Sequence, residues 1–176
     1  SGDIYLAKFS SQGNLHWANH IGRGGSMQQK GRIFVDNSND LIATVDYTDS
    51  IIIANNKDTT LYSGPASSNA NVILKLDSSG LIYENHIYNI QTKGNNGTIN
   101  MFGIQEHSGN YYFSGKFQDS VFFKSNEYES TGSTYDVFLL KTDNDLNDSW
   151  IRRTYGNGSD YSGSTTFDEY GNIYLT

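Results

Sequence analysis

Internal repetition constrains the fold of this chain more than any other feature of its sequence. The segment 3–9, DIYLAKF, returns at 136–142 as DVFLLKT, and Trp17 returns as Trp150 at the same spacing. A further copy, NVILKLD, lies between them at 71–77. Repetition at this period indicates a fold assembled from supersecondary units, each of which buries its apolar face against the next.

The other half of the unit repeats as well. The segment 47–53, YTDSIII, matches the segment 117–123, FQDSVFF. The strand expected before it at 40–44 has counterparts at 110–114 and 172–176. Each half of the unit therefore occurs three times in the chain.

Each unit predicts four strands, near 31–36, 40–53, 71–77 and 81–87. A single Pro, 18 Gly and abundant Tyr and Phe favour strands and tight turns, so we expect very little helix. The third strands are almost continuously apolar, which is typical of a sheet covered on both faces. Gly13 and Gly80 fit the following hairpin turn, whereas the third copy, DNDL at 143–146, lacks a glycine.

Four antiparallel strands per repeat are the pattern of a propeller blade. The sequence thus predicts an all-β chain of the β-propeller type with about three blades' worth of strands. Full blades are expected at 31–89 and 98–155, and partial blades at 1–22 and 162–176. Because a ring takes about 4 to 8 blades, we expect a larger ring, completed by the remainder of a longer chain or by another copy.

The strings DIYLAKF at 3–9, GNLHWA at 13–18 and GNIYLT at 171–176 resemble the bacterial β-propeller repeat family often labelled SBBP. The middle copy departs from this pattern, with Asn71 in place of Asp and Tyr83 in place of Trp. The resemblance implies a secreted or cell-surface bacterial protein whose propeller is a binding or spacing module. It implies no catalytic residues.

Composition and charge exclude several classes of partner and chemistry. Twelve basic and 19 acidic residues give a net charge of −7 without a basic cluster, so nucleic acid is not an expected partner. No apolar run approaches the roughly 20 residues of a membrane helix, so no membrane insertion is expected. The absence of cysteine removes disulfides, thiolate catalysis and cysteine-ligated zinc.

Two acidic segments, 36–40 and 143–148, place oxygen ligands at alternate positions, as a calcium loop would. Neither has the required glycine and distal glutamate. The segment 36–40 occupies the same hairpin of the repeat as 106–110 and 168–172, and a turn explains all three whereas calcium explains one. The glycine sets at 22–25 and 156–158 complete neither a dinucleotide fingerprint nor a P-loop, and they are interpreted as linkers between blades. No metal or cofactor is therefore predicted.

Single residues that repeat in register also have a structural interpretation. His20 and His86 are equivalent, but Arg153 takes their place in the third copy, so we expect partly exposed strand residues. Trp17, Tyr83 and Trp150 are expected to pack the fourth strand rather than to bind sugar. Glu127 and Glu129 could in principle form a glycosidase pair, although carboxylates on a solvated loop are commoner.

The sequence leaves three functional hypotheses. The first is a non-enzymatic binding or scaffolding propeller, adhesive toward protein or glycan through loops at 55–69 and 124–135. The alternative is an enzyme or enzyme accessory domain, for example a carbohydrate-active one, with its site in an axial channel completed by further blades. The third is a rigid spacer with no ligand of its own.

Overall fold

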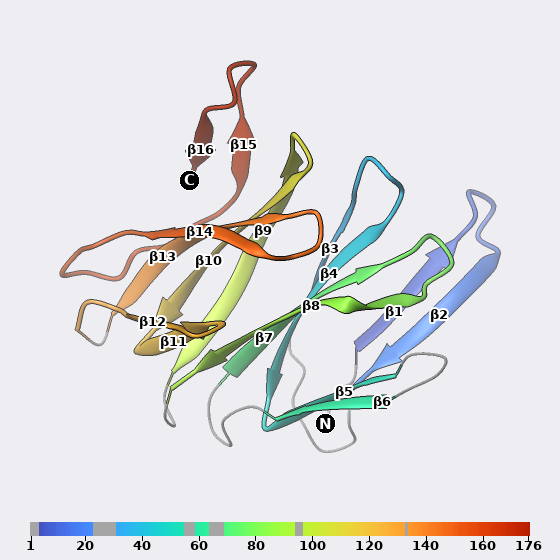
Figure 1. Ribbon diagram of the computed structural model, residues 1–176, viewed down its shortest axis with the longest axis horizontal. Helices are drawn as coiled ribbons and strands as arrows, with labels where there is room; N and C mark the ends of the chain where they lie inside the picture. Colours follow the sequence, from blue (N-terminus) through green and yellow to red (C-terminus); the bar gives the residue numbers. More distant parts are fainter. Residues whose placement is uncertain (1–3, 23–30, 55–58, 64–68, 94–96, 133) are drawn as a thin grey trace.

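The computed structural model describes residues 4–22, 31–54, 59–63, 69–93, 97–132 and 134–176. The regular secondary structure in these ranges consists of β-strands alone, which confirms the predicted all-β class (Figure 1). The described residues include no helix that could cross a membrane. The strands are β1 Ile4–Phe9, β2 Leu15–Ile21, β3 Gly31–Val35, β4 Leu41–Thr48, β5 Ser50–Ala54, β6 Thr59–Ser63, β7 Asn69–Leu76, β8 Ile82–Thr92, β9 Thr98–His107, β10 Asn110–Gln118, β11 Ser120–Phe123, β12 Asn126–Glu129, β13 Tyr135–Asp143, β14 Asp148–Arg153, β15 Thr165–Phe167 and β16 Ile173–Leu175.

The described strands form four antiparallel sheets. The first sheet has the order β1-β2-β5-β6, and the second has the order β3-β4-β7-β8-β11-β12. The third sheet has the order β9-β10-β13-β14, and the fourth consists of β15 and β16. Neighbouring strands in the sequence are joined mainly by hairpins, so most pairing within a sheet is local.

The long second strand expected at 40–53 is wrong, because two strands in different sheets replace it. β4 belongs to the second sheet, whereas β5 crosses to the first sheet and pairs beside β2. Asp49 separates them with a left-handed φ of 63°. Asp119 has a φ of 62° between β10 and β11, and there β11 crosses to the second sheet and pairs with β8. A residue in this conformation cannot continue an extended strand, so the chain turns at both places.

Each complete repeat therefore carries six strands rather than four. The two additional strands form a hairpin, β5–β6 in one repeat and β11–β12 in the next. They occupy the segments 55–69 and 124–135 in part, where the sequence predicted loops. The hairpin extends the sheet of the preceding repeat, so successive repeats are joined by backbone pairing as well as by side chains.

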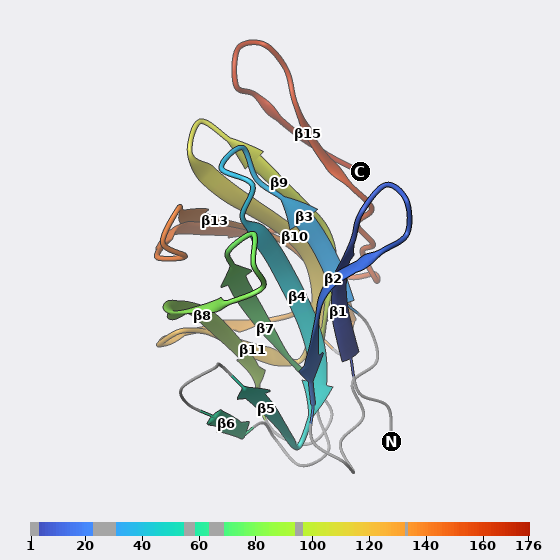
Figure 2. The ribbon, with the colours of Figure 1, turned by 90° about the vertical axis from the view of Figure 1, so that its right-hand side faces the viewer.

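The first three sheets lie one behind another in Figure 2, and two apolar cores fill the spaces between them. One core joins the first and second sheets through residues such as Leu6, Ile21, Val72 and Leu74. The other joins the second and third sheets through residues such as Ile73, Phe113 and Phe138. β7 contributes to both cores and is buried from Ala70 to Leu76, which confirms for the middle copy that the third strand is covered on both faces. In the first copy the prediction is wrong, because β1 is mostly exposed.

The side-chain register corrects one sequence alignment. Lys8 pairs with Trp17 and Lys141 pairs with Trp150, in agreement with the common spacing of these residues in the sequence. In the middle copy the equivalent residue is Lys75, one place earlier than the alignment of 71–77 with 3–9 implies. The pairing of β4 with β7 and of β10 with β13 puts Lys75 and Lys141 at matching positions. This register is used below to compare the sheets.

Candidate functional site: a groove between the first two sheets

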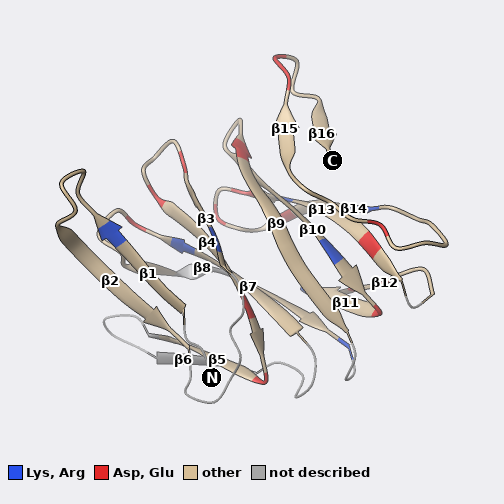
Figure 3. Ribbon diagram, turned by 180° about the vertical axis from the view of Figure 1, so that it is seen from behind, with Lys and Arg blue, Asp and Glu red and all other residues tan. Residues whose placement is uncertain are grey.

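Most of the hairpins share one turn in which an oxygen of the first side chain caps the backbone. In the hairpin between β7 and β8, the carboxylate Oδ1 of Asp77 accepts hydrogen bonds from the backbone N–H groups of Ser79 and Leu81. The same two contacts recur at the other turns of this type in the described chain, whose first residues are Ser10, Asp36, Asp143 and Asp168. Figure 3 shows acidic residues at the tips of the β3–β4 and β15–β16 hairpins.

These contacts give the acidic segments at 36–40 and 143–148 a structural role. Asp36 and Asp143 use their Oδ1 atoms to hold the turn, as Asp and Asn do in Asx turns. Within the described residues, no three His, Asp or Glu side chains gather in a way that could hold a metal ion. Glu106 holds the equivalent position in the β9–β10 hairpin but contacts another turn: its Oε2 accepts a hydrogen bond from the backbone N–H of Asn37 at 2.8 Å.

In two of the three repeats, a lysine near the end of the third strand contacts the turn of the following sheet. The Nζ of Lys8 donates to the carbonyl oxygen of Ser78 at 3.0 Å, and the indole Nε1 of Trp17 donates to the same oxygen at 3.1 Å. The Nζ of Lys75 donates to the carbonyl oxygen of Asn144 at 3.3 Å. Ser78 and Asn144 each stand second in their turns. We call this repeated interaction the lysine–turn contact.

The gap between the second and third sheets is closed by a buried polar cluster around Tyr111. The hydroxyl of Tyr111 donates to Asp36 Oδ2 at 2.6 Å and lies 2.8 Å from Asn144 Oδ1. Lys75 Nζ lies 3.7 Å from Asp36 Oδ2 and 3.5 Å from Asp40 Oδ2. Burial raises the pKa of Tyr111, and its hydrogen bond to Asp36 raises it further. The phenol is therefore a neutral hydrogen-bond donor at physiological pH.

The corresponding gap between the first and second sheets is open. Leu41 stands in the register position of Tyr111, and its smaller side chain carries no hydroxyl. A cavity of about 380 Å³ lies there. Its walls come from β1, β2, β3 and β4 and from the β7–β8 turn, through Leu6, Ala7, Lys8, Phe9, Trp17, Ile33, Val35, Asn39, Leu41, Asp77 and Ser78. We call this cavity the groove.

The groove has an apolar floor that is open to solvent. Phe9, Ile33 and Val35 are each more than half exposed, although strand residues of this kind are usually packed. Lys8 and Asp77 supply a cation and a carboxylate at its rim. Hydrogen bonding to the Ser79 hydroxyl is the largest influence on Asp77 and lowers its pKa, so this carboxylate is ionised at neutral pH.

The tryptophans support sheet packing, as the sequence predicted. Trp17 lies against Gly80, where an added Cβ would meet the indole Cδ2 at 2.7 Å. Trp150 packs edge-on against Tyr112, with ring centroids 6.1 Å apart. Tyr83 is half-buried and lies 3.4 Å from Asp40 through its hydroxyl. These aromatic rings contact neighbouring turns and strands, so a sugar platform is not needed to explain their recurrence.

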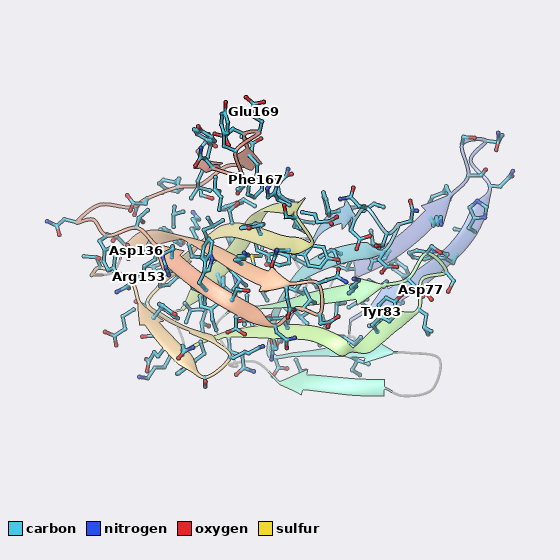
Figure 4. The ribbon with its side chains drawn as sticks, turned by 45° about the horizontal axis from the view of Figure 1, so that its top comes forward. Asp77, Tyr83, Asp136, Arg153, Phe167 and Glu169 are labelled. Atoms are coloured by element: carbon cyan, nitrogen blue, oxygen red, sulfur yellow. The ribbon has the colours of Figure 1, made fainter. Side chains whose placement is uncertain are left out.

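The other candidate residues are dispersed over the molecule. His20 is exposed beside Tyr5, the side chain of His86 lies outside the described residues, and Arg153 approaches the buried Asp136 at 3.9 Å (Figure 4). Glu127 lies on β12 rather than on a loop and pairs with Lys93 at 2.7 Å. The glycines of 156–158 lie between β14 and β15, whereas those of 22–25 after Gly22 fall outside the described residues.

Comparison with known protein families and with curated proteins finds no matching family model and no matching protein. The resemblance to SBBP repeats therefore stays a prediction from the repeat motifs.

The sequence did not predict the groove. Its signal lies in two equivalent positions of the repeat, Leu41 and Tyr111, which are separated by the same offset as the matching segments 47–53 and 117–123. The change from Tyr to Leu removes one ring and hydroxyl from this gap, and the first sheet also has no described counterpart of β3 and β4, which pack on β9 in the other gap. The effect of this difference on the gap can be inferred only once both side chains are known to face the preceding sheet, and the packing of the two cores shows that they do.

Proposed function

We propose that the chain is a run of β-propeller-type blades that acts as a non-enzymatic binding or scaffolding module of a secreted or cell-surface bacterial protein. Two observations support blades: β3-β4-β7-β8 and β9-β10-β13-β14 are four-stranded antiparallel units, and they stack face to face. The repeated lysine–turn contact fixes each unit on the next, as a rigid scaffold requires.

The groove supports a binding role for this scaffold. Exposed apolar patches with a polar rim mark contact sites on soluble proteins. The groove joins such a patch to the outer edge of β1, which pairs with no other described strand on that side. An unpaired edge beside an apolar surface suits a protein partner that adds a strand and inserts side chains. The observation that carries the proposal is the exposure of Phe9, Ile33 and Val35 at this edge.

A binding screen with matched variants tests this proposal. We would immobilise the wild-type chain and screen it against a random-peptide display library and a glycan array. Val35→Lys places a charge in the groove, and Tyr155→Lys does the same at an exposed residue after β14. We expect apolar, strand-forming peptides to bind wild type and Tyr155→Lys, and to bind Val35→Lys at least tenfold more weakly. Ligands that bind all three proteins equally would contradict a role for the groove.

A further inference from the structure

The second sheet shows what a complete sheet of this protein contains. Its order is β3-β4-β7-β8-β11-β12, with two strands from the start of a repeat, two from its end and a hairpin from the next repeat. The fourth sheet, β15–β16, matches the first two of these strands. The first sheet, β1-β2-β5-β6, matches the remaining four. One complete sheet is thus present in two parts, at opposite ends of the array (Figure 1).

We propose that a second copy of this chain joins these parts, so that β16 of one copy pairs antiparallel with β1 of the other. The resulting sheet would have the order β15-β16-β1-β2-β5-β6, with its first two strands from one copy and the rest from the other. The proposal names the partner of the groove and its strand edge, and to that extent it rests on the proposed function.

The pairing between the second and third strands of a blade is described twice, and both cases predict the same register for this contact. β4 places Ala43 opposite Leu74, and β10 places Phe113 opposite Leu140. Leu175 holds the position of Ala43 and Phe113, counted from the shared turns, and Ala7 holds that of Leu74 and Leu140. The expected pair is therefore Leu175 of one copy with Ala7 of the second copy.

Exposure at matching positions favours a partner here. Leu175 is 37% exposed, whereas Ala43 and Phe113 are fully buried. On the facing strand, Tyr5 is 70% exposed, although its counterparts Val72 and Phe138 are fully buried. Equivalent positions of the repeat are thus buried in the second and third sheets, and they are exposed to solvent in the first and fourth sheets. Pairing across copies would remove this apolar surface from water, which favours association.

The fourth sheet is already placed to take part in such a sheet. Phe167 of β15 packs on the third sheet, edge-on to Tyr112 and stacked on His107 (Figure 4). The second sheet occupies the equivalent place between the first and third sheets. By the same stacking, β15 and β16 of one copy would cover Ile33 and Val35 of the second copy and fill the groove.

The lysine–turn contact supplies a further match. Lys141 and Trp150 hold the positions of Lys8 and Trp17, which both donate to the second residue of the next turn. In the described structure, Lys141 Nζ instead lies 5.6 Å from the ring centroid of Tyr112. In the assembly, the next turn after the third sheet is the β1–β2 turn of the second copy, and its second residue is Ser11. Lys141 and Trp150 would donate to that carbonyl.

Two copies of the described strands, joined in this way at both ends, would hold about six blades, within the usual 4 to 8 of a closed ring. Two copies joined head to tail at both ends pair β16 with β1 twice, and the twofold rotation closes the array. The expected assembly is a dimer.

Mass measurement and one charge substitution test the assembly. Analytical ultracentrifugation of the wild-type chain should give twice the chain mass of 19.6 kDa. Leu175→Asp should give the mass of a single chain, because it would bury a carboxylate in the shared sheet. Leu81→Asp is the matched control: Leu81 is exposed to the same extent, at 38%, but lies outside the proposed contact. Circular dichroism would establish that both variants keep their strands.

A cysteine pair tests the register independently of whether Leu175→Asp folds. The chain has no cysteine, so Ala7→Cys with Leu175→Cys creates a pair without background. Oxidation should link two copies, because facing strand residues have the Cα spacing of a disulfide. Ala7→Cys with Tyr174→Cys shifts the register by one residue and directs the thiols to opposite faces, so it should link at least tenfold more slowly.

Three results would overturn the proposal: a single-chain mass at all concentrations, equal cross-linking by the two cysteine pairs, or a disulfide within one copy. If the chain is a monomer while peptide binding still depends on Val35, the groove binds another partner and the proposed function stands. If the chain is a dimer through the Leu175–Ala7 contact but no peptide or glycan is bound, the groove serves assembly alone.

Discussion

At the scale of single residues, contact between repeats depends on positions that a larger or differently shaped side chain would disturb. Gly80 has a left-handed φ of 88° in the β7–β8 turn, and its missing Cβ leaves room for the face of Trp17. Asn19 also donates its side-chain amide to the carbonyl of Gly80. The turn and the indole thus hold the first and second sheets together beside the groove.

Gly80→Ala tests this contact, with Gly13→Ala as its control. Both glycines have a left-handed φ, but nothing lies within 4 Å of a Cβ added at Gly13. We expect Gly13→Ala to lower the free energy of unfolding by about 1–2 kcal/mol, the cost of the left-handed conformation. Gly80→Ala should cost about 1–3 kcal/mol more, because the indole must move. Equal losses in urea denaturation would mean that the Trp17 contact contributes nothing.

The capping carboxylates make the free energy of unfolding depend on pH. Hydrogen bonds from Ser79 and Asn172 lower the pKa of Asp77 and Asp168 respectively. Burial alone would raise the pKa of Asp143, but hydrogen bonds, mainly from Asn147, outweigh it and the pKa is lowered. A carboxyl whose pKa is lower in the folded state stabilises that state above the unfolded pKa, about 3.9. This stabilisation is lost as the pH falls through the folded pKa.

We therefore expect the free energy of unfolding to be nearly constant from pH 7 to 5 and to fall steadily from about pH 4 downward. The triple variant Asp77→Asn, Asp143→Asn and Asp168→Asn keeps the capping oxygens but cannot titrate. Its stability should change less between pH 5 and 3 than that of wild type, as measured by urea denaturation at each pH. A parallel loss in both proteins would show that other carboxyls govern acid unfolding.

At the scale of strands and sheets, the sequence predicted most of the features that the repeats share, but few of the contacts between repeats and few of the places where strands end. The hairpin at Gly80 and the apolar third strand were predictable because turn residues and hydrophobic pattern act locally. Asp49 and Asp119 were missed as strand ends, because apolar residues follow both and favour continuation of the strand. The lysine–turn contact was also missed, since it joins residues that lie far apart in the sequence, such as Lys8 and Ser78.

Lys75 shows how burial changes the importance of an ion pair between elements. Lys75→Met leaves Asp36 without its buried counter-charge, so we expect a loss of about 3–5 kcal/mol in the free energy of unfolding. Lys93→Met breaks a shorter pair with Glu127, at 2.7 Å, but both partners are exposed, so it should cost below about 1 kcal/mol. Adding Asp36→Asn to Lys75→Met should recover part of the loss. Similar costs for the two lysines in chemical denaturation would contradict this account.

At the scale of the whole molecule, two stacked cores make each sheet depend on its neighbours. The second sheet is covered on both faces, whereas Tyr5 of the first sheet is largely exposed. A quasi-linear stack of this kind is weakest at its ends, because an end unit has one stabilising interface instead of two. Closing the array through a second copy would remove both ends.

This dependence leads to a prediction about heat stability. If two copies share a sheet, unfolding releases two chains, and each tenfold rise in concentration stabilises the dimer by about 1.4 kcal/mol. The Tm of wild type in differential scanning calorimetry should therefore rise by a few degrees per tenfold increase in concentration. Leu81→Asp should keep this slope, whereas Leu175→Asp should unfold at a lower Tm that does not change with concentration. A concentration-independent Tm in wild type, at concentrations where its mass is measured, would mean that each chain unfolds alone and that its end sheets are stable without a partner.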